Sequence, residues 1–185
     1  MTDQRSSRNS VDKGPLSDDL ESYNKAKQLL EEAVDLYRSY RVQLAQKVDS
    51  ISKIRRAPAT VDDVDMNSFD RSFLNNAIQK TYTAWQTLPE PKHSWEFSRL
   101  ITQLMFFMCD EWGDRDTAIF FAKENIKCVG GGRNPNLRYQ LGVHSYEIEE
   151  KHNLARAHFR FAKEYSKGKV FRTYTEESAK YSALL

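Results

Sequence analysis

Glycine and proline are scarce in this sequence, at seven and five of 185 residues. Together they reach roughly half of their usual share in a globular protein. A β-sandwich or a β-barrel turns about every 8–12 residues and would require more of both. This scarcity argues against those all-β folds and favours a chain built from helices.

Cysteine is also rare, and the sequence has neither a long apolar run nor a large excess of one charge. The two cysteines, Cys109 and Cys128, are too few for a disulfide framework and suit a reducing compartment. The longest apolar run, Leu104–Cys109, has six residues, far fewer than the roughly 18 of a membrane span. The net charge of +2 is well short of that of a dedicated nucleic-acid binder. We therefore expect a cytoplasmic protein with no membrane span and no nucleic-acid partner.

Hydrophobic residues make up 39% of the chain and aromatic residues 12%, which is enough for a real core. Residues 1–17 differ, because they are polar and contain one valine and one leucine. Such a segment buries too little surface to offset its ordering entropy. The sequence therefore predicts a disordered N-terminal tail over 1–17, without a secretory signal, and a single helical domain over 18–185.

Apolar residues recur at intervals of three, four and seven between residues 17 and 55, which predicts amphipathic helix. No glycine or proline interrupts this range, so it forms either one long helix or a hairpin with a polar turn near residues 40–42. We favour the hairpin, because a single helix of that length would leave much of its apolar face uncovered.

Five further helical stretches follow from the same spacing and from capping signals. Gly113 is a typical C-terminal residue, Asp114 or Asp116 can cap the next helix, and Asn134-Pro135 opens another. Thr173 and Glu176 predict a capping box before a short last helix. The five stretches cover approximately residues 68–87, 94–112, 114–129, 135–148 and 154–167.

The last two long stretches share a pattern with the tetratricopeptide repeat, although one interval is a residue longer. The matching residues are Leu141, Gly142, Tyr146, Ala155, Phe159 and Ala162. We interpret the pair as a degenerate helical-repeat hairpin. The predicted fold is all-α: an α-solenoid of about seven or eight helices in antiparallel pairs, similar to a tetratricopeptide superhelix.

The motifs that carry catalysis or cofactor binding are not evident. A phosphate-binding loop has Lys followed by Ser or Thr after its last glycine, but here Arg133 follows the triple glycine. We therefore interpret the glycines as a flexible connector between helices. His144 and Glu147 have the i, i+3 spacing of two metal ligands, but a di-iron bundle needs a second such pair. We therefore predict no enzyme activity, no cofactor and no metal. A helical metal protein or enzyme using His144 and Glu147 is the alternative.

Two basic stretches remain to be explained. The first lies between Arg38 and Arg56, includes Arg41, and has Asp49 as its one acid. The second follows one face of the last long helix, at Arg156, Arg160, Lys163 and Lys167. Each is either an ordinary solvated face, a docking surface for an acidic protein, or an RNA site. Interleaved aromatic residues are not evident, which argues against RNA.

Four short segments carry a family resemblance: Ala118–Phe121 before the glycines, Asn134–Arg138, Leu141-Gly142 and Asn153–Phe159. Together they resemble the Golgi-to-ER traffic protein four family, the cytosolic scaffold of the tail-anchored membrane protein pathway. Farther upstream, Tyr23–Gln28 matches the opening Y-x-x-A-x-Q of that family. The chain departs from the family at His144-Ser145-Tyr146, where the family has an apolar, Trp-containing turn.

This resemblance implies an α-solenoid without catalytic activity, which holds partners together while a hydrophobic client passes to the targeting ATPase. In the family the N-terminal half contacts this ATPase, and the C-terminal half binds a ubiquitin-like-domain co-factor. The chain corresponds to the N-terminal half, so the second partner's site is expected to lie outside it. The expected docking residues for the ATPase are Arg38, Arg41, Arg156, Arg160 and Lys163. The alternative is a generic helical-repeat interaction module of another pathway.

Overall fold

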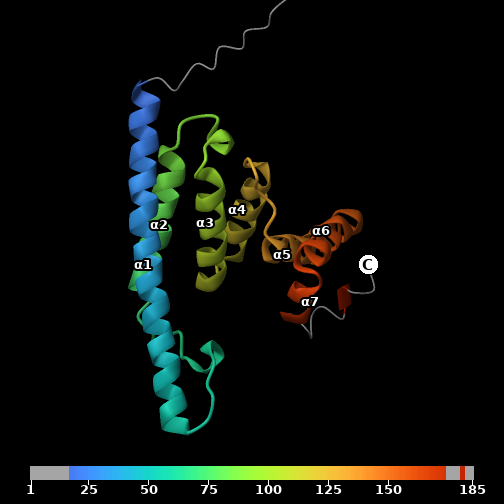
Figure 1. Ribbon diagram of the computed structural model, residues 1–185. Coiled ribbons are helices and arrows are strands. Elements are labelled where there is room, and N and C mark those ends of the chain that lie inside the picture. Colours follow the sequence, from blue (N-terminus) through green and yellow to red (C-terminus); the bar gives the residue numbers. More distant parts are fainter. Residues whose placement is uncertain (1–16, 174–179, 182–185) are drawn as a thin grey trace, which may run out of the picture.

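The computed structural model describes residues 17–173 and 180–181, and its regular elements are helices (Figure 1). The described ranges contain seven α-helices, two short 3₁₀ helices and no strand, which confirms the predicted all-α fold. The predicted tail and Glu176 of the last capping box lie outside the described residues, apart from Ser17. The elements are α1 (Ser17–Arg55), η1 (Val61–Asp63), α2 (Ser72–Thr87), η2 (Lys92–Ser94), α3 (Ser98–Trp112), α4 (Arg115–Lys127), α5 (Pro135–Glu147), α6 (His152–Ser166) and α7 (Lys169–Thr173).

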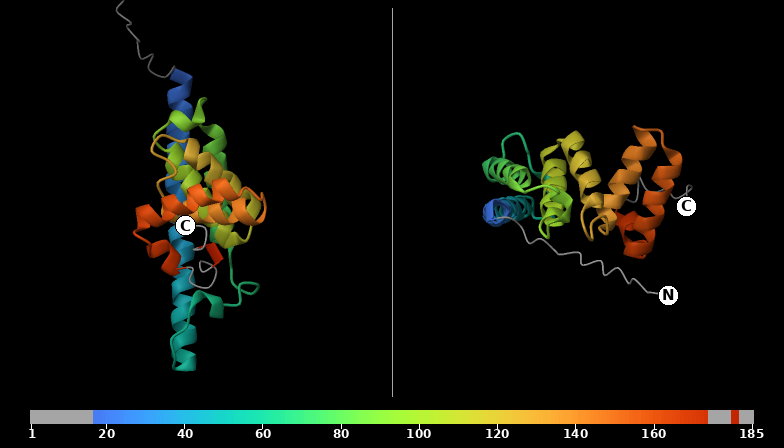
Figure 2. Two further views of the ribbon diagram at one scale, coloured as in Figure 1. Left: turned by 90° about the vertical axis from the view of Figure 1, so that its right-hand side faces the viewer. Right: turned by 90° about the horizontal axis from the view of Figure 1, so that it is seen from above.

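Consecutive helices pack as pairs: α1 with α2, α3 with α4, and α5 with α6. Further contacts of α2 with α3 and of α4 with α5 join the pairs into a row, which is clearest when the molecule is seen from above (Figure 2). Helices α1 to α4 run alongside one another, whereas α5 and α6 lie across them (Figure 1). This arrangement confirms the predicted solenoid-like stack of helix pairs.

The buried side chains form two clusters. The larger cluster spans α1 to α4 and includes Leu137 and Leu141 from α5. The smaller cluster joins α5, α6 and α7, with the rings of Tyr139, Phe159 and Tyr181 at its centre. The last helix pair is therefore held together by an aromatic core of its own.

Helix α1 is continuous over 39 residues, so the predicted hairpin is wrong. Tyr40, at the expected turn, is fully buried, and its ring packs against the edge of Phe69 with 5.9 Å between centroids. The segment between α1 and α2 folds back along α1 and buries Val64 in the same cluster. This segment and helix α2 together cover the apolar face of α1, which stabilises the single long helix.

Several helix ends agree with the sequence signals. Asn134 caps α5, where its Oδ1 accepts a hydrogen bond from the Asn136 amide at 2.9 Å, and Pro135 is the first helical residue. Asp114 caps α4, and Gly113 ends α3 with a φ of 96°. Helices α2 and α3 begin about one turn later than predicted.

The three glycines after α4 form a packed corner. A Cβ on Gly131 would lie 1.7 Å from the carbonyl oxygen of Asn125, so no larger residue fits. The Asn125 side chain accepts a hydrogen bond from the Gly132 amide at 2.9 Å and donates one to the Arg99 carbonyl at 2.8 Å. Arg138 Nε donates to the Gly132 carbonyl at 2.8 Å. The connector is therefore hydrogen-bonded to both adjacent helix pairs, α3–α4 and α5–α6.

Helices α5 and α6 approach closely at Gly142. A Cβ there would lie 2.7 Å from Cε1 of Phe159, whose ring is fully buried. Ala155 and Ala162 are fully buried in the same cluster. Small residues at this contact fit the tetratricopeptide-like spacing of the sequence.

Candidate functional site: a basic stripe on helix α6

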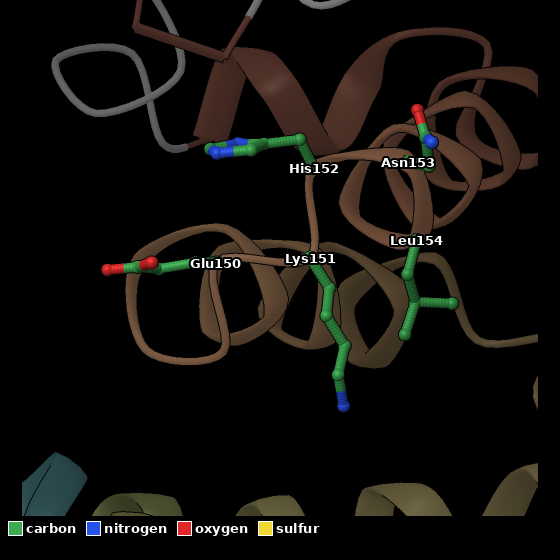
Figure 3. Close-up of a pocket in the computed structure, with 5 residues that line it drawn as sticks. All are labelled: Glu150, Lys151, His152, Asn153 and Leu154. Carbon is green, nitrogen blue, oxygen red and sulfur yellow. The ribbon is translucent and has the colours of Figure 1, made fainter.

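A hollow at the turn between α5 and α6 is lined by five consecutive residues, Glu150–Leu154 (Figure 3). In this view the side chains of Glu150 and His152 extend to the left, that of Asn153 points up, and those of Lys151 and Leu154 point down. An acid–base pair requires groups within hydrogen-bond reach of one another, and these five side chains do not form one.

His144 and Glu147, the candidate metal pair, contact different partners. His144 Nε2 lies 3.5 Å from Glu149 Oε1, whereas Glu147 accepts hydrogen bonds from Lys180 and Tyr181. A hydrogen bond from Lys123 lowers the pKa of Glu149 to about 2. Hydrogen bonds from Lys180 and Tyr181 lower the pKa of Glu147. Within the described ranges, no group of three or more His, Cys, Asp or Glu side chains is placed to hold a metal ion.

Cys109 and Cys128 are buried and free. Burial raises the pKa of Cys109 to about 12 and also raises the pKa of Cys128. Both groups are therefore protonated at neutral pH, whereas nucleophilic attack and metal binding require the thiolate.

The two predicted docking residues on α1 are engaged within the chain. Arg38 Nη1 lies 2.8 Å from Asp35 Oδ1, and Arg41 Nη1 lies 2.8 Å from Glu111 Oε1. Glu111 also accepts a hydrogen bond from Tyr37 at 2.7 Å, which ties α1 to the end of α3. An acidic partner would have to compete with these carboxylates for the two arginines.

The three predicted docking residues on α6, Arg156, Arg160 and Lys163, are exposed. They lie on one side of the helix with Lys167, the exposed residue that caps its end. We call these four side chains the basic stripe. The stripe is about 16 Å long, because an α-helix rises 1.5 Å per residue. It runs beside the residues that α6 buries, namely Ala155, His158, Phe159 and Ala162.

The positive charge continues from α6 into α7. Lys169 and Arg172 are exposed. Nη1 of Arg172 lies 4.0 Å from the point where a Cβ on Gly168 would be. Glu164 is the one acid between residues 156 and 172. Among the described residues, neither Glu164 nor any cation of the basic stripe forms an ion pair. Within the described ranges, these cations are therefore exposed and are not ion-paired with an acid of the chain.

His158 lies on the buried side of α6 and joins it to α5. Its Nδ1 is 3.2 Å from Arg138 Nη1 and accepts the hydrogen bond, because a guanidinium has only donors. Burial and the positive charge of Arg138 lower the pKa of His158 to about 4. The imidazole is therefore neutral at physiological pH. Its hydrogen bond with Arg138 helps to hold α6, which carries the stripe, against α5.

Acidification from pH 7 to pH 5 is expected to lower the free energy of unfolding by about 2 kcal/mol through His158. The folded-state pKa of about 4 lies below the ordinary 6.5, so in this window the unfolded chain binds a proton that the folded chain does not. Stability therefore rises with pH up to about pH 7. Urea unfolding at both pH values measures the effect.

The control is His158→Gln, which keeps an acceptor for Arg138 and does not titrate. Acid effects from other groups, such as the nearby Glu149, are common to both proteins and cancel in the comparison. The variant should lose about 2 kcal/mol less than the wild type. An equal loss in both would contradict the neutral, buried imidazole.

Sequence reasoning did not anticipate the acids that pair with Arg38 and Arg41. Asp35 precedes Arg38 by three residues, and this helical spacing is a signal for the first pair. Glu111 is 70 residues from Arg41, and no local pattern indicates that pair. The docking residues that remain without an acid partner in the described chain are Arg156, Arg160 and Lys163.

Comparisons of the chain with protein-family models, with curated proteins and with solved structures found no match. None of the helices in the described ranges has the length and apolar character required to cross a bilayer. The candidate site is thus defined by its own geometry, as a row of exposed cations on the last long helix.

Proposed function

We propose that the chain is a cytoplasmic, non-enzymatic adaptor that docks protein partners, and that one partner is the targeting ATPase of the tail-anchored protein pathway. The observation that carries this proposal is the basic stripe, whose exposed cations have no acid partner in the described chain. A row of like charges on a packed helix is a preformed docking surface for an acidic protein. Such a surface accelerates association more than it increases affinity.

The fold supports the same role. Stacked helix pairs expose extended surfaces, which solenoid proteins use to bind partners. The resemblance of residues 117–181 to the Golgi-to-ER traffic protein four family supplies the pathway. In this proposal the ATPase contacts the basic stripe, and a ubiquitin-like-domain co-factor belongs to the same assembly.

A generic helical-repeat module of another pathway is the second candidate. The close packing at Gly142 and Phe159 favours it, because this feature is shared by interaction modules with unrelated partners. Such a module would use the same stripe but would not bind the targeting ATPase.

The proposal predicts that the purified full chain retains the targeting ATPase in a pulldown at about 50 mM salt and releases most of it at about 500 mM, where charge interactions are screened. Arg160→Glu should weaken the interaction about tenfold, because it places a like charge against the acidic partner. The matched control is Lys25→Glu, the same charge reversal at an exposed position of α1.

Two results would count against this account. Binding that is indifferent to salt and to Arg160→Glu would remove the basic stripe from the interaction. Failure of the ATPase to bind at either salt concentration would contradict the pathway and leave the generic module.

A further inference from the structure

We infer that the occupant of the basic stripe is a short acidic protein segment, an inference that rests on the proposed adaptor function. The four cations lie at positions i, i+4, i+7 and i+11, which form one row along the helix. Carboxylates at the same intervals on a partner helix would face them over the full length of about 16 Å. An extended partner segment would cover the same length with about five residues. The partner segment therefore needs no more than about twelve residues.

The distribution of charge favours a short segment over a long polyanion. Residues 156–172 contain six Lys and Arg against one Glu, a net charge of +5 in a chain of net charge +2. The rest of the sequence therefore has a net charge of −3. A polyanion that extends beyond the stripe gains no net positive charge from the rest of the sequence, whereas a segment as long as the stripe needs only these cations.

The placement of the exposed aromatic residue supports the same choice. Tyr165 is 57% exposed and stacks on Phe161 with 4.2 Å between centroids. At 3.6 residues per turn, Tyr165 lies about 170° around α6 from the centre of the stripe. A nucleic acid could not stack a base on Tyr165 while its nearby phosphates contact the stripe. Similarly, a bilayer could not receive Tyr165 at its interface while its headgroups contact the stripe.

The denser charge at one end indicates where the most acidic part of the segment lies. Three exposed cations, Lys167, Lys169 and Arg172, fall within six residues at the junction of α6 and α7, whereas Arg156 is four residues from the next cation of the stripe. We expect the partner's carboxylates to concentrate at the α7 end.

Fluorescence anisotropy with the full chain tests this inference with defined probes at about 50 mM salt. The first probe is a labelled 12-residue peptide of alanine and glutamine with glutamates at positions 1, 5, 8 and 12. The others are the same peptide with four glutamines, a 20-nucleotide single-stranded RNA, and vesicles containing 30% phosphatidylserine. The acidic peptide should bind more tightly than any of these.

The double variant Arg160→Glu/Lys163→Glu should weaken peptide binding at least about tenfold. The control Lys25→Glu/Arg99→Glu changes the net charge equally at exposed positions of α1 and α3 and should alter it less than about twofold. A circular dichroism melt of each variant establishes that it is folded.

Tighter binding of RNA or vesicles than of the acidic peptide would overturn the inference, and so would equal binding of the acidic and glutamine peptides. The proposed function fails separately. ATPase binding without peptide binding overturns only the acidic segment, whereas peptide binding without ATPase binding supports the segment and contradicts the pathway.

Discussion

Replacing Gly142 by valine is expected to lower the free energy of unfolding by about 3 kcal/mol. The first added carbon would lie 2.7, 2.8 and 3.0 Å from three ring atoms of Phe159. That ring cannot retreat easily, because it is fully buried and stacks on Tyr181 with 4.8 Å between centroids. Urea denaturation followed by circular dichroism measures the loss.

Gly142→Ala separates packing from helix propensity. Propensity alone favours alanine over glycine by about 1 kcal/mol. We expect a net loss of stability instead, and a smaller loss in a Phe159→Leu background, where the ring has been removed. A coupling of about 1 kcal/mol between the two sites would support the close approach of α5 and α6. A gain in stability from Gly142→Ala in the wild-type background would contradict it.

Replacing Asn125 by alanine is expected to destabilise the chain by about 3 kcal/mol. The side chain is 1% exposed and makes three hydrogen bonds, to the Gly132 amide, the Arg99 carbonyl and Thr102 Oγ1. Its removal leaves the buried Gly132 donor without its partner. It also releases the corner that connects α4 to α5. Thermal unfolding and urea denaturation both report the effect.

Asn76→Ala is the matched control, because Asn76 is exposed on α2. This variant should stay within about 0.5 kcal/mol of the wild type. Similar stabilities for the two alanine variants would show that Asn125 does not hold the corner.

The features of the fold that depend on neighbouring residues could be predicted from the sequence. Asn134-Pro135 and Gly113 mark helix ends through local backbone geometry, and the structure has those ends. The continuity of α1 could not be predicted in this way. It depends on contacts from farther along the chain: the ring of Phe69 packs against Tyr40, and Val64 joins the same buried cluster.

In the candidate site, too, the features set by nearby residues could be predicted, and those set by distant contacts could not. The spacing of Arg156, Arg160 and Lys163 places them on one side of a helix, and the structure has them exposed there. The basic residues of α1 looked equivalent in the sequence. Arg41, however, pairs with Glu111 across the fold, an acid that only the packing of α1 against α3 brings near.

Site-specific photo-crosslinking tests the central claim, that a partner sits on the basic stripe, most directly. A photoreactive residue at Glu164, exposed beside the stripe, leaves all four cations in place, and one at the exposed Gln46 of α1 is the control. The account predicts that the targeting ATPase crosslinks at position 164, that about 500 mM salt suppresses this product, and that position 46 yields none. Crosslinking at position 46 alone, or equally at both positions, would contradict it.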